Sequence, residues 1–110
     1  MINRSVLIVR PKQAFLDWAK ALDDSELVPD PDGEMTCYLI PNFDTEEELW
    51  EIIEEIHPTI FENELWSWHT DEGAWPQTRD LASFQNWFGI EVHTVVEDLC
   101  DYELVDEDVD

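Results

Sequence analysis

The stretch 44–68, DTEEELWEIIEEIHPTIFENELWSW, decides the fold that this sequence predicts. Its apolar residues recur at the i, i+3, i+4, i+7 spacing of one helix face: Leu49, Ile52, Ile53 and Ile56. The opposite face carries four carboxylates: Glu47, Glu51, Glu54 and Glu55. The apolar stripe suits a hydrophobic core, and the acidic face suits water or a basic partner.

The ends of this helix follow from its capping residues and its proline. We expect Asp44 or Thr45 to cap the helix, because three glutamates follow in the first turn, where the helix dipole favours negative charge. Pro58 has no amide hydrogen to donate, so we expect it to end or kink the helix near Ile56. One or two further turns would then follow.

Shorter elements flank the long helix. Strands are expected at 5–9, 35–40 and 90–96, and further helices at about 11–22 and from Thr78 onward. Pro11 would lie in the first turn of its helix, and Gly89 would take a left-handed conformation after the last helix. Residues 23–34 read as a loop, because prolines, a glycine and many acids interrupt any periodicity.

The order of these elements is β-α-β-α-α-β, which predicts an α/β fold, with α+β as the alternative. A strand, a crossover helix and a second strand favour a right-handed parallel pair. We expect one small domain at 1–100, a three-stranded sheet covered by helices, and an acidic C-terminal tail at 101–110.

The charge of the chain is extreme. The formal net charge is -23, from 28 acidic and 5 basic residues, and only Arg79 is basic after Lys20. Direct binding to nucleic acid or to an anionic membrane is therefore excluded, because both need cations. The start of the chain lacks a secretory signal pattern, and no apolar run approaches about 18 residues, so we expect a cytoplasmic protein. In that compartment its two cysteines would be reduced.

Three segments resemble a family of small acidic bacterial proteins of uncharacterised activity: PKQAFLDWAKAL, YLIPNF and the region DEGAWPQTRDLASFQNWF. The resemblance covers most of the chain. It implies a bacterial cytoplasmic protein, and it implies no activity and no functional residues.

Candidate catalytic and metal-binding residues are few. The segment Asp30-Pro-Asp-Gly-Glu34 has part of a calcium-loop pattern but lacks the spacing of an EF-hand, and a solvated turn is the simpler interpretation. The histidines and cysteines show no zinc-ligand spacing, so we expect no metal and no cofactor. His69, Asp71 and Glu72 lie in an irregular segment and could perform general acid–base chemistry, which leaves a hydrolytic or metal-dependent enzyme as the alternative function.

The hypothesis that the sequence favours is a non-enzymatic protein that binds a basic protein. The predicted binding residues are those of the acidic helix face with one tryptophan at its edge: Glu47, Trp50, Glu51, Glu54 and Glu55. Trp50 lies about 110° from the centre of the apolar stripe, at 100° per residue. Carboxylates about 6 Å apart along a helix resemble the regular charges of a phosphate backbone. A nucleic-acid mimic and an immunity-like or antitoxin-like inhibitor both fit, and the oligomeric state stays open.

Overall fold

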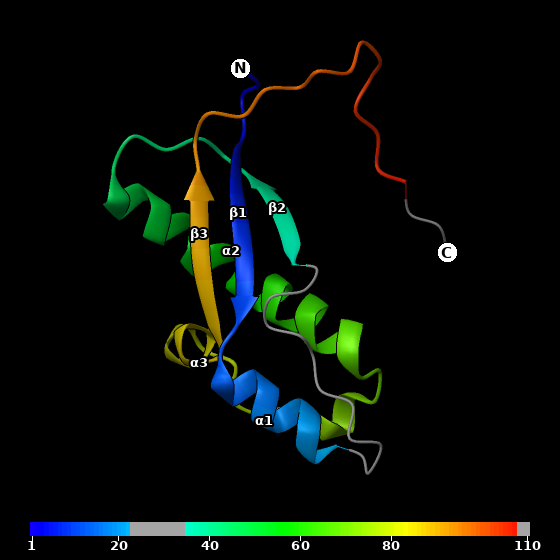
Figure 1. The fold of residues 1–110 in the computed structure, drawn as a ribbon. Coiled ribbons are helices and arrows are strands. Elements are labelled where there is room, and N and C mark those ends of the chain that lie inside the picture. Colours follow the sequence, from blue (N-terminus) through cyan, green and yellow to red (C-terminus); the bar gives the residue numbers. More distant parts are fainter. Residues whose placement is uncertain (23–34, 108–110) are drawn as a thin grey trace.

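The protein is a small α/β domain, and its computed structural model describes residues 1–22 and 35–107 (Figure 1). The described residues contain the predicted order of strands and helices, with one additional 3-10 turn, η1, between the last two helices. The elements are β1 (Ser5–Pro11), α1 (Gln13–Ala21), β2 (Thr36–Ile40), α2 (Glu46–Trp68), η1 (Glu72–Ala74), α3 (Leu81–Trp87) and β3 (Phe88–His93).

The three strands form one antiparallel sheet in the order β2-β1-β3. In the centre of the sheet, Leu7 of β1 lies opposite Tyr38 of β2 and Val92 of β3. The predicted parallel pair of β1 and β2 is therefore wrong. The reason is the position of α1, which lies beyond the end of β1 instead of along the sheet (Figure 1). The chain consequently enters β2 from the end at which it left β1, and the two strands run in opposite directions.

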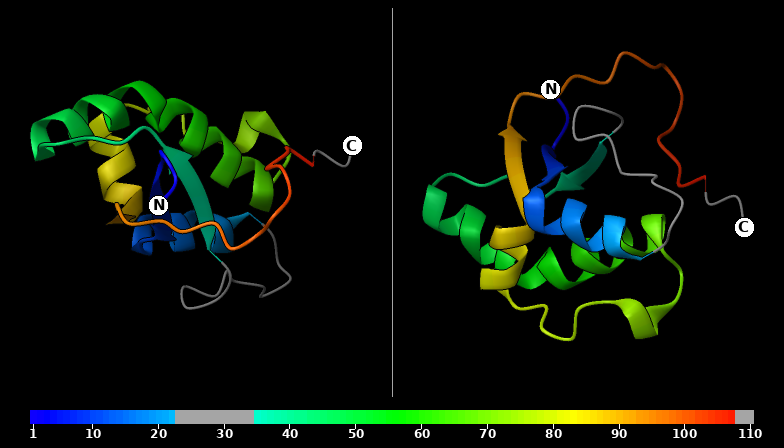
Figure 2. Two further views of the ribbon diagram at one scale, coloured as in Figure 1. Left: turned by 90° about the horizontal axis from the view of Figure 1, so that it is seen from above. Right: turned by 60° about the horizontal axis from the view of Figure 1, so that its bottom comes forward.

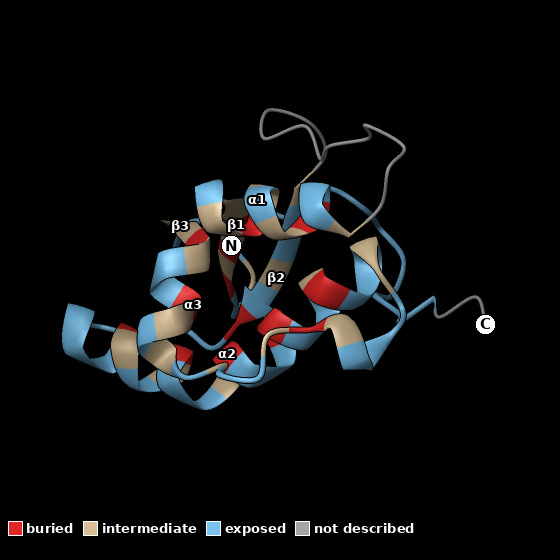
Figure 3. Ribbon diagram, turned by 90° about the horizontal axis from the view of Figure 1, so that it is seen from below, coloured by how far each residue is buried: buried red, intermediate tan, exposed pale blue. Residues whose placement is uncertain are grey.

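The core lies between one face of the sheet and the helices. Alternation along β1 buries Ser5, Leu7 and Val9 on this inner face. Figure 2 shows α2 passing along one side of the sheet, and Figure 3 shows its buried positions on the side that faces the other elements. Phe61 of α2 and Phe84 of α3 both pack on Phe88 of β3, with ring centroids 5.3 and 5.4 Å apart. Aromatic rings thus join α2, α3 and β3 into one hydrophobic core.

The other face of the sheet is called the outer face below. It carries the alternate residues of the three strands: Val6, Ile8, Arg10, Cys37, Leu39, Glu91 and His93. All of these are half-buried or exposed, and Leu39 is 48% exposed. A cysteine within the short strand expected at 35–40 would be interpreted as a small core residue. This interpretation is wrong, because Cys37 is exposed on the outer face of an edge strand.

Helix α2 spans 23 residues and contains Pro58, so the prediction that the helix could end near Ile56 is wrong. Pro58 cannot donate the hydrogen bond that the Glu54 carbonyl would otherwise accept. The His57 ring supplies it instead, since its Nδ1 lies 2.8 Å from the Glu54 carbonyl oxygen. A carbonyl only accepts, so Nδ1 carries the hydrogen in this contact. The buried histidine therefore compensates for the proline next to it and lets the helix continue.

Three local predictions also differ from the structure. Pro11 ends β1 and Lys12 is the N-terminal cap of α1, so the proline is outside the helix. The helix expected from Thr78 onward begins at Leu81 instead, and Asp80 caps it, because its carboxylate accepts a hydrogen bond of 2.8 Å from the Ser83 amide. Gly89 lies in β3 opposite Arg10, where the backbone is extended.

Candidate protein-binding surface

The N-terminal end of α2 is fixed by two reciprocal hydrogen bonds. The Thr45 hydroxyl accepts from the Glu48 amide at 3.1 Å, and the Glu48 carboxylate accepts from the Asp44 amide at 2.8 Å. This arrangement resembles a capping box and selects Thr45 from the two predicted caps. The helical period then determines the direction in which each later side chain of α2 points.

The structure brings the predicted carboxylates together on the solvent side of α2. Glu47, Glu51, Glu54 and Glu55 are all exposed, and Glu62 extends the same side by two turns. These five residues are called the acidic surface below. Ion pairs in the described residues involve Glu91 and Glu97 and none of these five. Residues 23–34 include no lysine or arginine, so the sequence offers no additional cation there. The acidic surface thus carries uncompensated negative charge.

The aliphatic stripe of α2 is only partly as predicted. Leu49 and Ile53 are buried, whereas Ile52 and Ile56 are half-buried and pack against the edge of the core. Trp50 is also half-buried and packs against the core. It borders the acidic surface, since it precedes Glu54 by one helical turn. Part of its ring area is therefore already used by the fold.

Trp66 is not among the predicted binding residues, but it borders the acidic surface. It is 56% exposed and lies one turn after Glu62 and about three turns after Glu55, on the same side of α2. Its ring contacts the buried Trp75 edge-on, with centroids 6.5 Å apart. The spacing of Glu55, Glu62 and Trp66 places them on one side of a helix. This is apparent from the sequence only if the helix is taken to continue through Pro58.

One glutamate of α2, Glu64, faces the sheet and is half-buried. The carboxylate of Glu64 accepts a hydrogen bond of 3.1 Å from the Thr36 hydroxyl, and burial raises its pKa. Burial and the nearby Glu64 carboxylate also raise the pKa of Tyr38 to about 12. Thr36 and Asn63 lie close enough to moderate this rise, although neither meets the geometry of a hydrogen bond to the buried Tyr38 hydroxyl.

His69, Asp71 and Glu72 were the residues of the alternative, enzymatic hypothesis. Within the described residues, their hydrogen bonds stabilise the local structure. The Asp71 carboxylate accepts from the Gly73 amide at 3.0 Å and so stabilises η1. The His69 carbonyl accepts from the indole nitrogen of Trp75 at 2.9 Å, which fixes this buried ring. Glu72 is exposed in the first turn of η1. The side chain of Asp71 and the backbone carbonyls of His69 and Glu72 thus form a turn that seats Trp75 in the core.

The candidate metal ligands are not gathered into a site within the described residues. No group of three or more histidine, cysteine, aspartate or glutamate side chains there is placed to hold a metal ion. The calcium-like segment Asp30-Pro-Asp-Gly-Glu34 lies outside the described residues. Within the described part of the chain, no helix is both long and apolar enough to cross a membrane.

Comparisons with protein-family models, with curated proteins and with solved structures found no match to this chain.

Proposed function

We propose that this protein binds a basic protein through the acidic surface of α2 and does not catalyse a reaction. The observation that carries the proposal is the uncompensated row of carboxylates on one continuous helix. A cationic partner would gain Coulomb attraction along several turns of the helix. Such attraction accelerates association and selects against acidic partners.

Two tryptophans border the acidic surface and add apolar contact area to it. Trp50 lies near its N-terminal half, and Trp66 lies at its C-terminal end. Tryptophan is enriched among the residues that dominate binding energy, and charge alone gives little net affinity at an exposed surface. We therefore assign recognition and encounter to the carboxylates and persistence of the complex to the tryptophans.

The spacing of the carboxylates supports two kinds of inhibitor within this proposal. Successive turns place the charges about 6 Å apart along a rigid axis, which is a regular array that a phosphate-binding surface would accept. A nucleic-acid mimic and an immunity-like or antitoxin-like inhibitor of a basic nuclease share this property. Both act by occupying the partner's cationic surface, and the cytoplasm of a bacterium is the compartment that we propose for either.

A pull-down from bacterial lysate with matched charge variants tests the proposal. One variant reverses Glu47, Glu51, Glu54 and Glu55 to lysine, and the control reverses Asp101, Glu103, Asp106 and Glu107 to lysine. Both variants change the net charge equally, and all eight residues are exposed. We expect basic proteins to be captured by the wild type and by the control and to be lost from the α2 variant. Equal capture by all three proteins would contradict the proposal.

A further inference from the structure

The outer face of the sheet combines an apolar centre with positive charge at both ends. Val6 and Ile8 form the centre with the 48% exposed Leu39, which lies opposite Val6. Arg10 lies at one end of this row, and the alternation of β1 places Arg4 at the other end. Glu91 reduces this charge, because it pairs with Arg10 at 3.3 Å and with His93 at 2.8 Å. Arg4 and Arg10 are two of the five basic residues of the chain, and against Glu91 they leave this face with one net positive charge.

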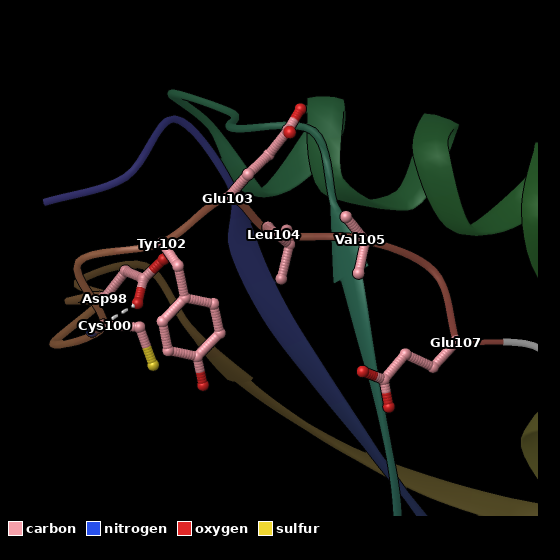
Figure 4. Close-up of a pocket in the computed structure, with 7 residues that line it drawn as sticks. All are labelled: Asp98, Cys100, Tyr102, Glu103, Leu104, Val105 and Glu107. Carbon is pink, nitrogen blue, oxygen red and sulfur yellow. Dashed lines mark hydrogen bonds between the residues drawn. The ribbon is translucent and has the colours of Figure 1, made fainter.

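The segment after β3 has the complementary composition. Residues 95–105 include five large apolar side chains that are 60–95% exposed: Val95, Leu99, Tyr102, Leu104 and Val105. Four acidic residues lie among them: Glu97, Asp98, Asp101 and Glu103. In Figure 4, Cys100, Tyr102 and Leu104 point to one side of the segment and Glu103 to the other. These side chains help to line a hollow of about 160 Å³ that is formed by the segment alone.

The segment begins beside the N-terminal end of β1. The Ile2 amide donates to the Val96 carbonyl at 2.8 Å, and the N-terminal amino group pairs with Glu97 at 2.8 Å. Both contacts hold residues 96–97 next to the start of β1 (Figure 1). Seven extended residues span roughly 23 Å at about 3.3 Å each, so residues 98–104 are as long as β1 itself. The tether therefore lets the segment reach the whole apolar row.

We propose that residues 98–107 fold back over the outer face of the sheet, with Tyr102 and Leu104 packed on Val6, Ile8 and Leu39. Two exposed apolar surfaces of one chain then cover each other, and the acidic residues of the segment approach Arg4 and Arg10. The covalent tether favours this occupant over a separate molecule, because it supplies a high effective concentration. The acidic segment thus acts as a strap over a face with net positive charge, independently of the acidic surface of α2.

Cys37 reports on this docking, because its thiol lies on the outer face between Ile8 and the free edge of the sheet. The experiment uses the full chain with Cys100→Ser, so that Cys37 is the single thiol. The rate of its alkylation by iodoacetamide, an uncharged reagent, is followed by mass spectrometry. The test variant adds Tyr102→Ser and Leu104→Ser, and the matched control adds Leu99→Ser, which is 95% exposed and does not line the hollow.

If the docked strap is about ten times as populated as the released strap, Cys37 is accessible only in the minor, released state. Alkylation of Cys37 is then about tenfold slower than without the strap. We expect the test variant to remove this protection, the control to retain it, and Arg4→Gln to weaken it. An unchanged rate in the test variant, or an equal acceleration in the control, would overturn the proposal. Protection that grows with protein concentration would also overturn it, because the occupant would then be the segment of a second copy.

Discussion

Replacing His57 by phenylalanine should cost stability only while Pro58 is present. The Nδ1 atom of His57 donates to the Glu54 carbonyl that Pro58 leaves without its helical partner. His57→Phe keeps a ring near Phe84, whose centroid lies 5.9 Å away, but it removes the donor. Pro58→Ala restores a backbone amide that can donate to the same carbonyl.

The expected loss of stability depends on whether the Glu54 carbonyl still accepts a hydrogen bond. A buried acceptor without a hydrogen bond costs about 1–3 kcal/mol. The contact is only partly buried, so we expect His57→Phe to cost about 1–2 kcal/mol in the wild-type background. With Pro58→Ala in place, the same substitution should cost less than about 0.5 kcal/mol. The coupling between the two positions should therefore be about 1 kcal/mol or more.

Urea unfolding of the four proteins, followed by tryptophan fluorescence, measures this coupling. The dependence of the unfolding free energy on urea should be the same in all four, which shows that the two-state comparison holds. A coupling within about 0.3–0.5 kcal/mol of zero is what independent sites give. That result would refute the argument that the histidine compensates for the proline.

Three further predictions concern the core, the half-buried Glu64 and the net charge. Ile53→Ala should cost about 2–5 kcal/mol in urea unfolding, because Ile53 is fully buried, and a loss below about 1 kcal/mol would contradict its placement. Glu64 has a raised pKa in the folded state, so stability should increase as pH falls through the interval above its ordinary value of 4.5. Glu64→Gln should therefore stabilise the protein at pH 7 more than the exposed control Glu62→Gln does, and this advantage should vanish below pH 4.5; equal effects of the two substitutions would contradict the burial of Glu64. The urea midpoint should rise between 0.01 M and 0.1 M salt, because the screening length falls from about 30 Å to about 10 Å, and a constant midpoint would show that the acids are compensated.

The amphipathic pattern of α2 was readable from the sequence because its period reports burial directly. Ile53 was predicted to lie in the apolar stripe, and it is fully buried. Asp44 and Thr45 were the two predicted N-terminal caps, and Thr45 is the cap. The order of strands and helices also followed from local patterns. The direction of strand pairing did not, because it depends on whether α1 lies along the sheet or beyond its end, and local sequence does not report that position.

The errors along α2 share one physical cause. A proline removes a hydrogen bond, but a neighbouring side chain can replace it, and the replacement depends on where the His57 ring points. Once the helix is known to continue, Trp66 falls on the side of the acidic surface. Cys37 illustrates a different limit, because a short strand of mixed residues does not reveal which of its faces is buried.

The central claim is that the arrangement of carboxylates on α2 drives binding, and not the total charge of the chain. Its most direct test is the association rate of the basic protein captured by the wild type, measured at several salt concentrations for wild type, α2 variant and C-terminal control. We expect the wild type and the control to associate rapidly, with rates that fall steeply as salt increases, and the α2 variant to associate slowly at every salt concentration. Equal slowing in the α2 variant and the control would show that only the total charge matters and would contradict the claim.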